Sequence, residues 1–231
     1  MDMKSNHEKK RKYYWLAIIA AGWGTAWSLS WILPIIPHLE QPLLLLALSG
    51  FLGGIIAGYG ESASHPTNIG WGIVAPMVWT ISWPVLNFGT AVSLQIMSPG
   101  IQSFDIDYLA DLAFGGFLSA IPGFLAGIIV ALPQSILLQK VDNPRTRRSG
   151  CMRIAVTMGR IVVSWGIAAF VAAATGLVTQ YSYPFGVYPT VLEAMSWSIP
   201  GGIIGGLVFA WLSLGTVEWL IDVPSPKHQT K

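Results

Sequence analysis

Few side chains with catalytic or ligand-binding chemistry lie within the apolar stretches of this chain. Ionisable and amide groups at membrane depth are costly to bury, so they often mark functional paths. If the helices surround an axis, acidic groups at the outer helix ends would form a vestibule that attracts cations; otherwise they are solvated helix ends with no further role. The candidates for such a vestibule or path are Glu40, Asp111, Glu193, Arg160 and Gln134.

Two of these candidates have a structural alternative. Arg160 lies about two turns inside the expected helix that begins near Met152. There it would contact an anion or a lipid headgroup at the inner mouth, or extend its side chain back to the interface or pair with Glu218. Gln134 would line a path or, as is commoner, form a hydrogen bond between helices.

Three tryptophans are expected at membrane depth, namely Trp79, Trp83 and Trp165. An indole ring offers a large contact area and a single polar N–H group, which suits the wall of an aromatic binding pocket. The alternative is that these rings only fill the space between helices.

Signatures of enzymatic chemistry are absent from the sequence. It contains no G-x-S-x-G, H-E-x-x-H or G-x-x-x-x-G-K-[ST] motif and no Cys/His spacing typical of a metal site. All four histidines lie in the tails or in the turns between the expected helices, so axial ligation of a membrane haem is unsupported. We therefore predict no catalytic residue, no metal, no cofactor and no enzymatic activity.

The composition indicates that lipid is the solvent of most of the chain. Hydrophobic residues make up 53% and charged residues only 10%, against roughly 25% charged in ordinary globular domains. A helix needs about 20 apolar residues to cross a bilayer. Six uncharged stretches reach that length, which predicts six transmembrane helices: 13–39, 41–60, 62–104, 112–139, 161–192 and 194–217.

The basic residues predict the orientation. All 13 Lys and Arg fall in 4–12, 140–160 and 227–231, and with six crossings these segments share one side, which the positive-inside rule makes cytoplasmic. The expected organisation is a basic cytoplasmic tail over 1–12, a transmembrane domain over 13–221 and a cytoplasmic tail over 222–231. The expected location is a bacterial cytoplasmic or internal membrane.

A glycine template recurs in the second, fourth and sixth expected helices as [LI]-[SP]-G-x-[LI]-x-G. Glycines four residues apart remove two side chains from one helix face and allow another helix to approach closely. The predicted helix-packing residues are Gly50, Gly54, Gly123, Gly127, Gly201 and Gly205.

A second template, Ser-Trp, ends at Trp31, Trp83 and Trp165 in the other three helices. Together the templates predict three two-helix hairpins, about 13–59, 69–139 and 152–221, arranged around an axis along the membrane normal. The alternative is coincidence in a chain rich in Gly, Ser and Trp.

The second half of the chain carries a glycine-rich segment at 123–127, a Gln-led amphipathic segment at 134–139, basic residues at 145–148 and then Ser164-Trp165-Gly166. In this order the segments resemble those of Trp- and Gly-rich multi-span bacterial membrane proteins without an assigned activity. The resemblance implies a polytopic membrane protein and brings no known chemistry.

The predicted fold is therefore an all-α membrane bundle of six helices. The expected function is that of a small-solute permease or a membrane substrate-binding subunit, with a non-catalytic structural or assembly subunit of a membrane complex as the alternative. Glycines that surround a polar cavity would favour the first function, and glycines that line an outward groove would favour the second. The expected partners are the lipid bilayer and either another membrane protein or further copies of the chain, and not nucleic acid.

Overall fold

The computed structural model describes residues 3–33, 41–64, 69–101, 108–139, 147–181 and 190–221, and these residues are almost entirely helical. The all-α class predicted from the sequence is confirmed. In chain order the helices are α1 (Met3–Ile32), α2 (Pro42–Ser64), α3 (Ile69–Ile101), α4 (Tyr108–Gln139), α5 (Arg147–Tyr181) and α6 (Val191–Ile221).

Two helices begin earlier than the apolar pattern predicts. The backbone of α1 is helical from Met3 rather than from Tyr13, and α5 begins at Arg147 rather than at Met152. Both extensions are rich in Lys, Arg or Glu, which are good helix formers. Because these residues are charged, the apolar stretch, and with it the expected helix, begins only after them. Helical structure therefore continues past the apolar limits into the basic segments.

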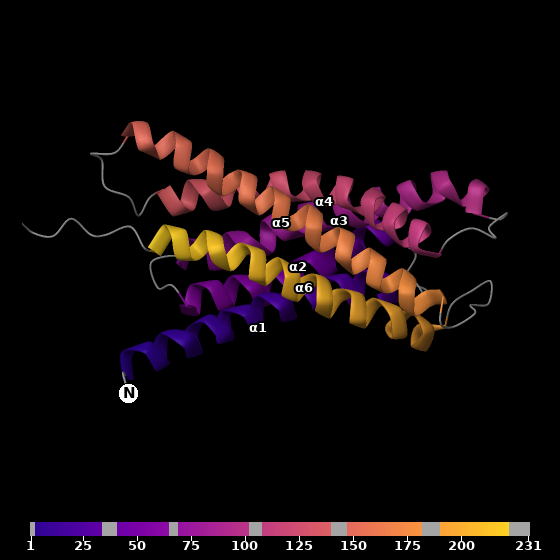
Figure 1. The fold of residues 1–231 in the computed structure, drawn as a ribbon, viewed down its shortest axis with the longest axis horizontal. Coiled ribbons are helices and arrows are strands. Elements are labelled where there is room, and N and C mark those ends of the chain that lie inside the picture. Colours follow the sequence, from indigo (N-terminus) through magenta and orange to yellow (C-terminus); the bar gives the residue numbers. More distant parts are fainter. Residues whose placement is uncertain are drawn as a thin grey trace, which may run out of the picture.

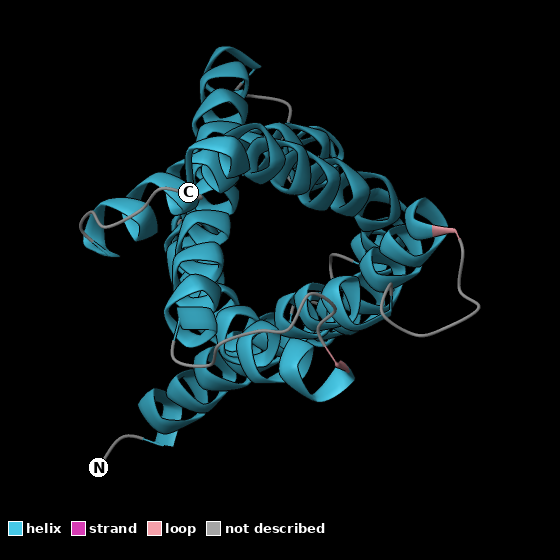
Figure 2. Cartoon of the chain, turned by 90° about the vertical axis from the view of Figure 1, so that its right-hand side faces the viewer, coloured by secondary structure: helices cyan, strands magenta, loops and turns pink. Residues whose placement is uncertain are grey.

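The six helices run side by side along the long axis of the molecule (Figure 1). Each helix packs against its neighbours in the sequence, and α6 also packs against α1, so the order α1 to α6 closes into a ring. Figure 2 shows this ring end-on, with the helices at its perimeter. Ring closure directs one face of every helix to a shared interior.

Five of the helices are long and apolar enough to cross a membrane. Within the described residues α3 is not among these five, although it contains no charged residue. The helices are thus those of a membrane-embedded protein, and the sixth crossing stays a prediction. The five candidate spans are Lys12–Ile32, Leu43–Gly60, Ala113–Ser135, Ile154–Gly176 and Val191–Ser213.

The outer surface of the ring is apolar and its interior is aromatic. Large aliphatic and aromatic side chains such as Met77, Phe117 and Leu132 are more than half exposed on the outside. Because lipid would cover that surface, the arrangement is the one expected of a bilayer-embedded bundle. The largest fully buried side chains are instead Trp15, Trp23, Trp27, Trp83 and Trp165.

Most buried hydroxyl groups are satisfied within their own helices. These hydroxyl groups donate to the backbone carbonyl four residues earlier, so the O–H donor is satisfied without a contact to another helix. Distances of 2.7 to 2.9 Å are found for Ser30, Ser49, Thr90, Ser119 and Ser164. Buried polar atoms that lack such a bond therefore stand out.

Candidate functional site

Five tryptophans from three helices meet in the interior of the ring, and we call them the aromatic core: Trp23 and Trp27 of α1, Trp79 and Trp83 of α3, and Trp165 of α5. None of them is more than 2% exposed. They include all three tryptophans proposed from the sequence as a pocket wall. Trp23 and Trp27 were missed as site residues, although their spacing of four places them on one helix face.

The rings of the aromatic core contact one another directly. Trp23 stacks on Trp27 with centroids 5.5 Å apart, and Trp79 stacks on Trp83 at 5.6 Å. Trp165 packs edge-on against Trp79 at 5.4 Å and against Trp83 at 5.5 Å. Edge-to-face and offset contacts of this kind are the preferred arrangements of aromatic pairs. The rings therefore fill much of the space between α1, α3 and α5.

The six template glycines hold these rings in place. A Cβ atom at Gly54 would lie 3.0 Å from Trp79 Cβ, and one at Gly127 would lie 2.9 Å from Trp165 Cβ. Gly50 faces the Trp79 carbonyl and Trp83 Cβ, while Gly123 lies 3.0 Å from the Trp165 carbonyl by the same measure. Any side chain at these positions would push a tryptophan-bearing helix away.

The glycines of α6 make room for the tryptophans of α1. A Cβ atom at Gly205 would lie 2.9 Å from Trp23 Cζ3, and one at Gly201 would lie 3.3 Å from Trp27 Nε1. The glycines and tryptophans singled out separately in the sequence thus meet in one arrangement. The glycines face other helices of the same chain, and neither of the two alternatives stated from the sequence, a polar cavity or an outward groove, describes them.

One indole N–H group of the aromatic core is fully satisfied. Trp83 Nε1 donates to Ser30 Oγ at 2.6 Å and to the Ala26 carbonyl at 3.1 Å. Ser30 Oγ in turn donates to the same carbonyl at 2.7 Å. This small network joins α1 to α3 and leaves Trp83 no donor for a ligand.

Other buried polar atoms have no hydrogen-bond partner within the described residues. They are the indole Nε1 atoms of Trp15, Trp23, Trp27 and Trp165, together with Asn87 Oδ1 and Ser198 Oγ. An unmatched buried N–H loses its hydration without compensation, so each such group calls for an acceptor. Three of the donors lie on α1 between Trp15 and Trp27, and at 1.5 Å per residue they extend over about 18 Å of the bundle axis.

The charged and amide candidates are not gathered at this core. Glu193 caps its own helix, since the Thr190 backbone N–H donates to Glu193 Oε2 at 2.5 Å and the Glu193 N–H donates to Thr190 Oγ1 at 3.2 Å. The two bonds form a capping box. Gln134 is half-buried on α4, and the Arg160 side chain is exposed on α5. Arg160 lies in the first half of α5, whereas Glu193 lies at the start of α6, at the end of the bundle where α5 finishes (Figure 1).

Two acidic candidates stay untested as vestibule residues. Glu40 lies outside the described residues, and for Asp111 only the helical backbone at the start of α4 is described. Among the residues that the structure describes, no cluster of three or more His, Cys, Asp or Glu side chains is placed to hold a metal ion.

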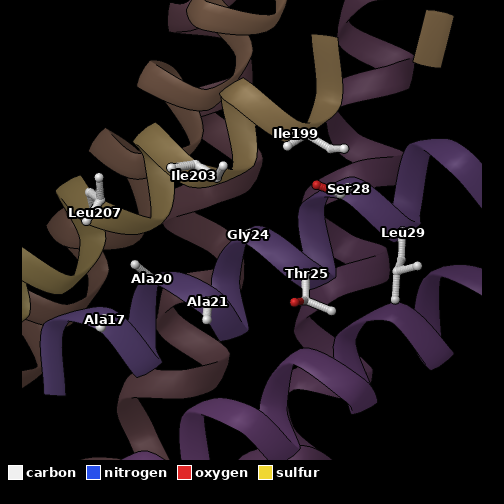
Figure 3. A pocket seen from close by; sticks show the side chains of 10 residues that line it. All are labelled: Ala17, Ala20, Ala21, Gly24, Thr25, Ser28, Leu29, Ile199, Ile203 and Leu207. Carbon is white, nitrogen blue, oxygen red and sulfur yellow. The ribbon is translucent and has the colours of Figure 1, made fainter. Parts of the chain in front are cut away.

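A hollow of about 530 Å³ lies between α1 and α6 (Figure 3). Its α1 side consists of two rows of small residues at four-residue spacing, and its α6 side consists of aliphatic residues. Thr25 and Ser28 supply its side-chain hydroxyl groups. The lining residues are Ala17, Ala20, Ala21, Gly24, Thr25, Ser28, Leu29, Ile199, Ile203 and Leu207.

Comparison with known proteins gives no family assignment, because no family model matches the chain and no significant match is found among curated proteins or solved structures. The resemblance to Trp- and Gly-rich bacterial membrane proteins therefore stays a prediction.

Proposed function

We propose that the protein is a non-catalytic integral membrane protein that binds or conducts a small solute along the tryptophan-lined interior of a six-helix ring. The observation that carries this proposal is the set of buried indole N–H groups without acceptors. If all these N–H groups lay at one point, they would suit a binding site. They are instead distributed along the bundle axis, which suits a path for a solute. A small-solute permease or a membrane substrate-binding subunit fits these features best.

The proposal includes a sixth crossing by α3. Ile73, Met77 and Ile81 are each more than 60% exposed and recur every four residues, so they form an apolar stripe on the outside of α3. The opposite face carries the buried Trp79 and Trp83. A helix that is apolar towards the outside and aromatic towards the interior is suited to lipid. Six crossings would put both termini on one side, the cytoplasmic side of a bacterial membrane.

The glycine contacts also support the hairpin repeat and suggest its register. Gly54 of α2 faces Trp79 on α3, and Gly127 of α4 faces Trp165 on α5 in the same manner. This correspondence pairs Trp79 with Trp165, one helical turn away from the alignment based on Ser-Trp. The register of the proposed repeat follows the glycine contacts, because they are the contacts between helices that a repeat must preserve.

The unmatched atoms define the class of solute. Four of them are N–H donors, whereas Asn87 Oδ1 is an acceptor and Ser198 Oγ can donate or accept. A solute with several acceptor lone pairs and few donors would therefore be bound best, which describes a small anion or a small carbonyl compound. Indole N–H groups are neutral, so they would bind such a solute more weakly than a buried lysine or arginine. The solute could then leave the site and move along the path.

The test is solute flux into liposomes that contain the purified full-length protein. We expect nitrate or formate to enter faster than into empty liposomes, and potassium not to do so. Replacement of Trp23 or Trp165 by Phe removes the N–H group but keeps most of the ring, and is expected to lower the flux by about fivefold, equivalent to about 1 kcal/mol for one hydrogen bond. Trp211→Phe is the matched control, because that ring is 69% exposed on the outside. Equal flux in the Trp165 and Trp211 variants would contradict the proposal.

A second candidate function, that of an assembly subunit, is favoured by the hollow between α1 and α6. Its small residues on α1, including Ala17, Ala21 and Thr25, extend over three turns, enough to receive part of a partner helix. Ala21→Leu would fill the hollow from an exposed position, and its test is copurification in mild detergent. Loss of a stoichiometric membrane-protein partner with unchanged solute flux would favour the assembly role.

A further inference from the structure

We propose that Asn87 of α3 makes the interior path selective for a small neutral amide over a small anion. The solute path proposed above would admit either a small anion or a small carbonyl compound. Asn87 can select between these two classes only if that path exists, so its role rests on the proposed function. A primary amide carries a carbonyl oxygen, which indole N–H groups can bind, and N–H donors, which require an acceptor.

Asn87 is the polar member of a row of buried residues on α3. Trp79, Trp83 and Asn87 follow one another at four-residue spacing, so they lie on one helix face. Asn87 is only 4% exposed. The ring of Trp83 contacts Trp23 at 5.2 Å and Trp165 at 5.5 Å. Asn87 lies about one turn, roughly 6 Å along the axis, beyond Trp83 and therefore near the level of two indoles with unmatched N–H donors.

A hydrogen bond fixes which end of the Asn87 amide is free. Asn87 Nδ2 donates to the Trp83 carbonyl at 3.1 Å. Because a carbonyl oxygen can only accept, the NH₂ end of the amide has to face it, and this settles the orientation of the side chain. Asn87 Oδ1 is left buried without a hydrogen-bond partner in the described part of the chain. The side chain thus presents an acceptor that is held in place by its own helix.

The donors closest to Asn87 along the chain and in the aromatic core are already engaged. Thr90 Oγ1 donates to the Leu86 carbonyl at 2.8 Å, so its hydrogen is used within α3. Trp83 Nε1 donates to Ser30 Oγ at 2.6 Å. A buried carbonyl without a donor loses its hydration uncompensated. A solute that brings its own N–H group would supply the donor that these side chains do not.

An acceptor at this point favours an amide and disfavours an anion. Nitrate has only acceptor oxygens, so its lone pairs would face those of Asn87 Oδ1 with no hydrogen between them. This repulsion is stronger in an interior of low dielectric constant than in water. Acetamide is of similar size, but its NH₂ group can donate to Asn87 Oδ1 and its carbonyl oxygen can accept from an indole N–H. Asn87 is thus a specificity-determining residue in a path whose other unmatched groups are mainly donors.

The experiment compares acetamide and nitrate fluxes into liposomes that contain the full-length protein, both followed by stopped-flow light scattering. The wild-type protein is expected to admit acetamide faster than nitrate. Asn87→Leu keeps the size of the side chain but removes the acceptor. It should lower the acetamide flux by about fivefold, the effect expected for one hydrogen bond, without lowering the nitrate flux. Asn87→Ala adds no bulk and should show the same selective loss.

Ser119→Ala is the matched control, because it removes another fully buried polar group, one whose donor is satisfied within its own helix. It should leave the ratio of acetamide flux to nitrate flux unchanged. An equal loss of both fluxes in the Asn87 variants would show a packing role and overturn the proposed selectivity. Nitrate flux without acetamide flux in the wild type would overturn the preference for amides but leave the solute path standing, whereas the absence of both fluxes would refute the path itself.

Discussion

The glycine contacts predict that the same substitution has opposite effects at two positions in the bundle. A Cβ atom at Gly123 would lie 2.7 Å from Ala169 Cβ and 3.0 Å from the Trp165 carbonyl, whereas one at Gly159 would meet no atom within 4 Å. Overpacking costs about 2 kcal/mol and replacement of Gly by Ala in a helix contributes about 1 kcal/mol. Gly123→Ala should therefore destabilise the protein by about 1 kcal/mol, and Gly159→Ala should stabilise it by a similar amount.

The second step of this test is a double-mutant cycle. Ala169→Gly removes the atom nearest to the new methyl group, and alone it should cost about 1 kcal/mol in helix propensity. The double variant carries Ala at position 123 and Gly at position 169, so α4 and α5 can again approach each other closely at this point. We expect the double variant to be more stable than the sum of the single effects by about 1 kcal/mol.

The assay is thermal unfolding of the purified protein in detergent, followed by intrinsic tryptophan fluorescence. A change of 1 kcal/mol corresponds to about 2–4 °C in Tm for a chain of this size. The order of melting temperatures should be Gly159→Ala above wild type, and wild type above Gly123→Ala. Equal shifts for the two glycine variants, or additive effects in the cycle, would refute the close packing of α4 on α5.

Three further results are expected. Ser30→Ala should destabilise the fold by about 1 kcal/mol because Trp83 Nε1 loses its nearest acceptor, whereas Ser119→Ala, which breaks a bond only within α4, should cost less in the same melting assay; equal costs would contradict the role of the network. Thr190→Ala should remove half of the capping box and increase hydrogen exchange in the first turn of α6, and unchanged exchange would argue against that cap. Cys151 should react with a membrane-impermeant thiol reagent in inside-out vesicles only, and labelling of intact cells would reverse the proposed orientation.

The helices could be predicted from the sequence because lipid requires long uncharged segments with internally paired backbones. The polar ends of the helices could not be predicted in this way. Hydropathy alone places the start of α1 near Tyr13, whereas the helix begins at Met3. Nor does the apolar pattern show which face of α3 lies outside, whereas the structure places Ile73, Met77 and Ile81 on the outer face and the tryptophans in the interior.

The candidate site was predictable only in its parts. Spacing indicated that Gly123 and Gly127 would receive another helix and that Trp165 would lie at membrane depth, but it could not show that both glycines face Trp165 itself. The role of Trp23 depended on closure of the ring between α1 and α6, and contacts across that distance in sequence leave no local pattern. The cap formed by Glu193 was visible as Thr190 followed three residues later by an acid.

The most direct test of the solute path is nuclear magnetic resonance of the protein with ¹⁵N-labelled tryptophan, in which each indole N–H gives its own signal. Signals are assigned by single Trp→Phe variants, and nitrate or formate is then added. We predict saturable shifts of the Trp23, Trp27 and Trp165 signals, with little change for Trp83, whose N–H is already bonded, or for the outward-facing Trp211. Unchanged interior signals at every solute concentration, or shifts limited to Trp211, would contradict a path through the interior.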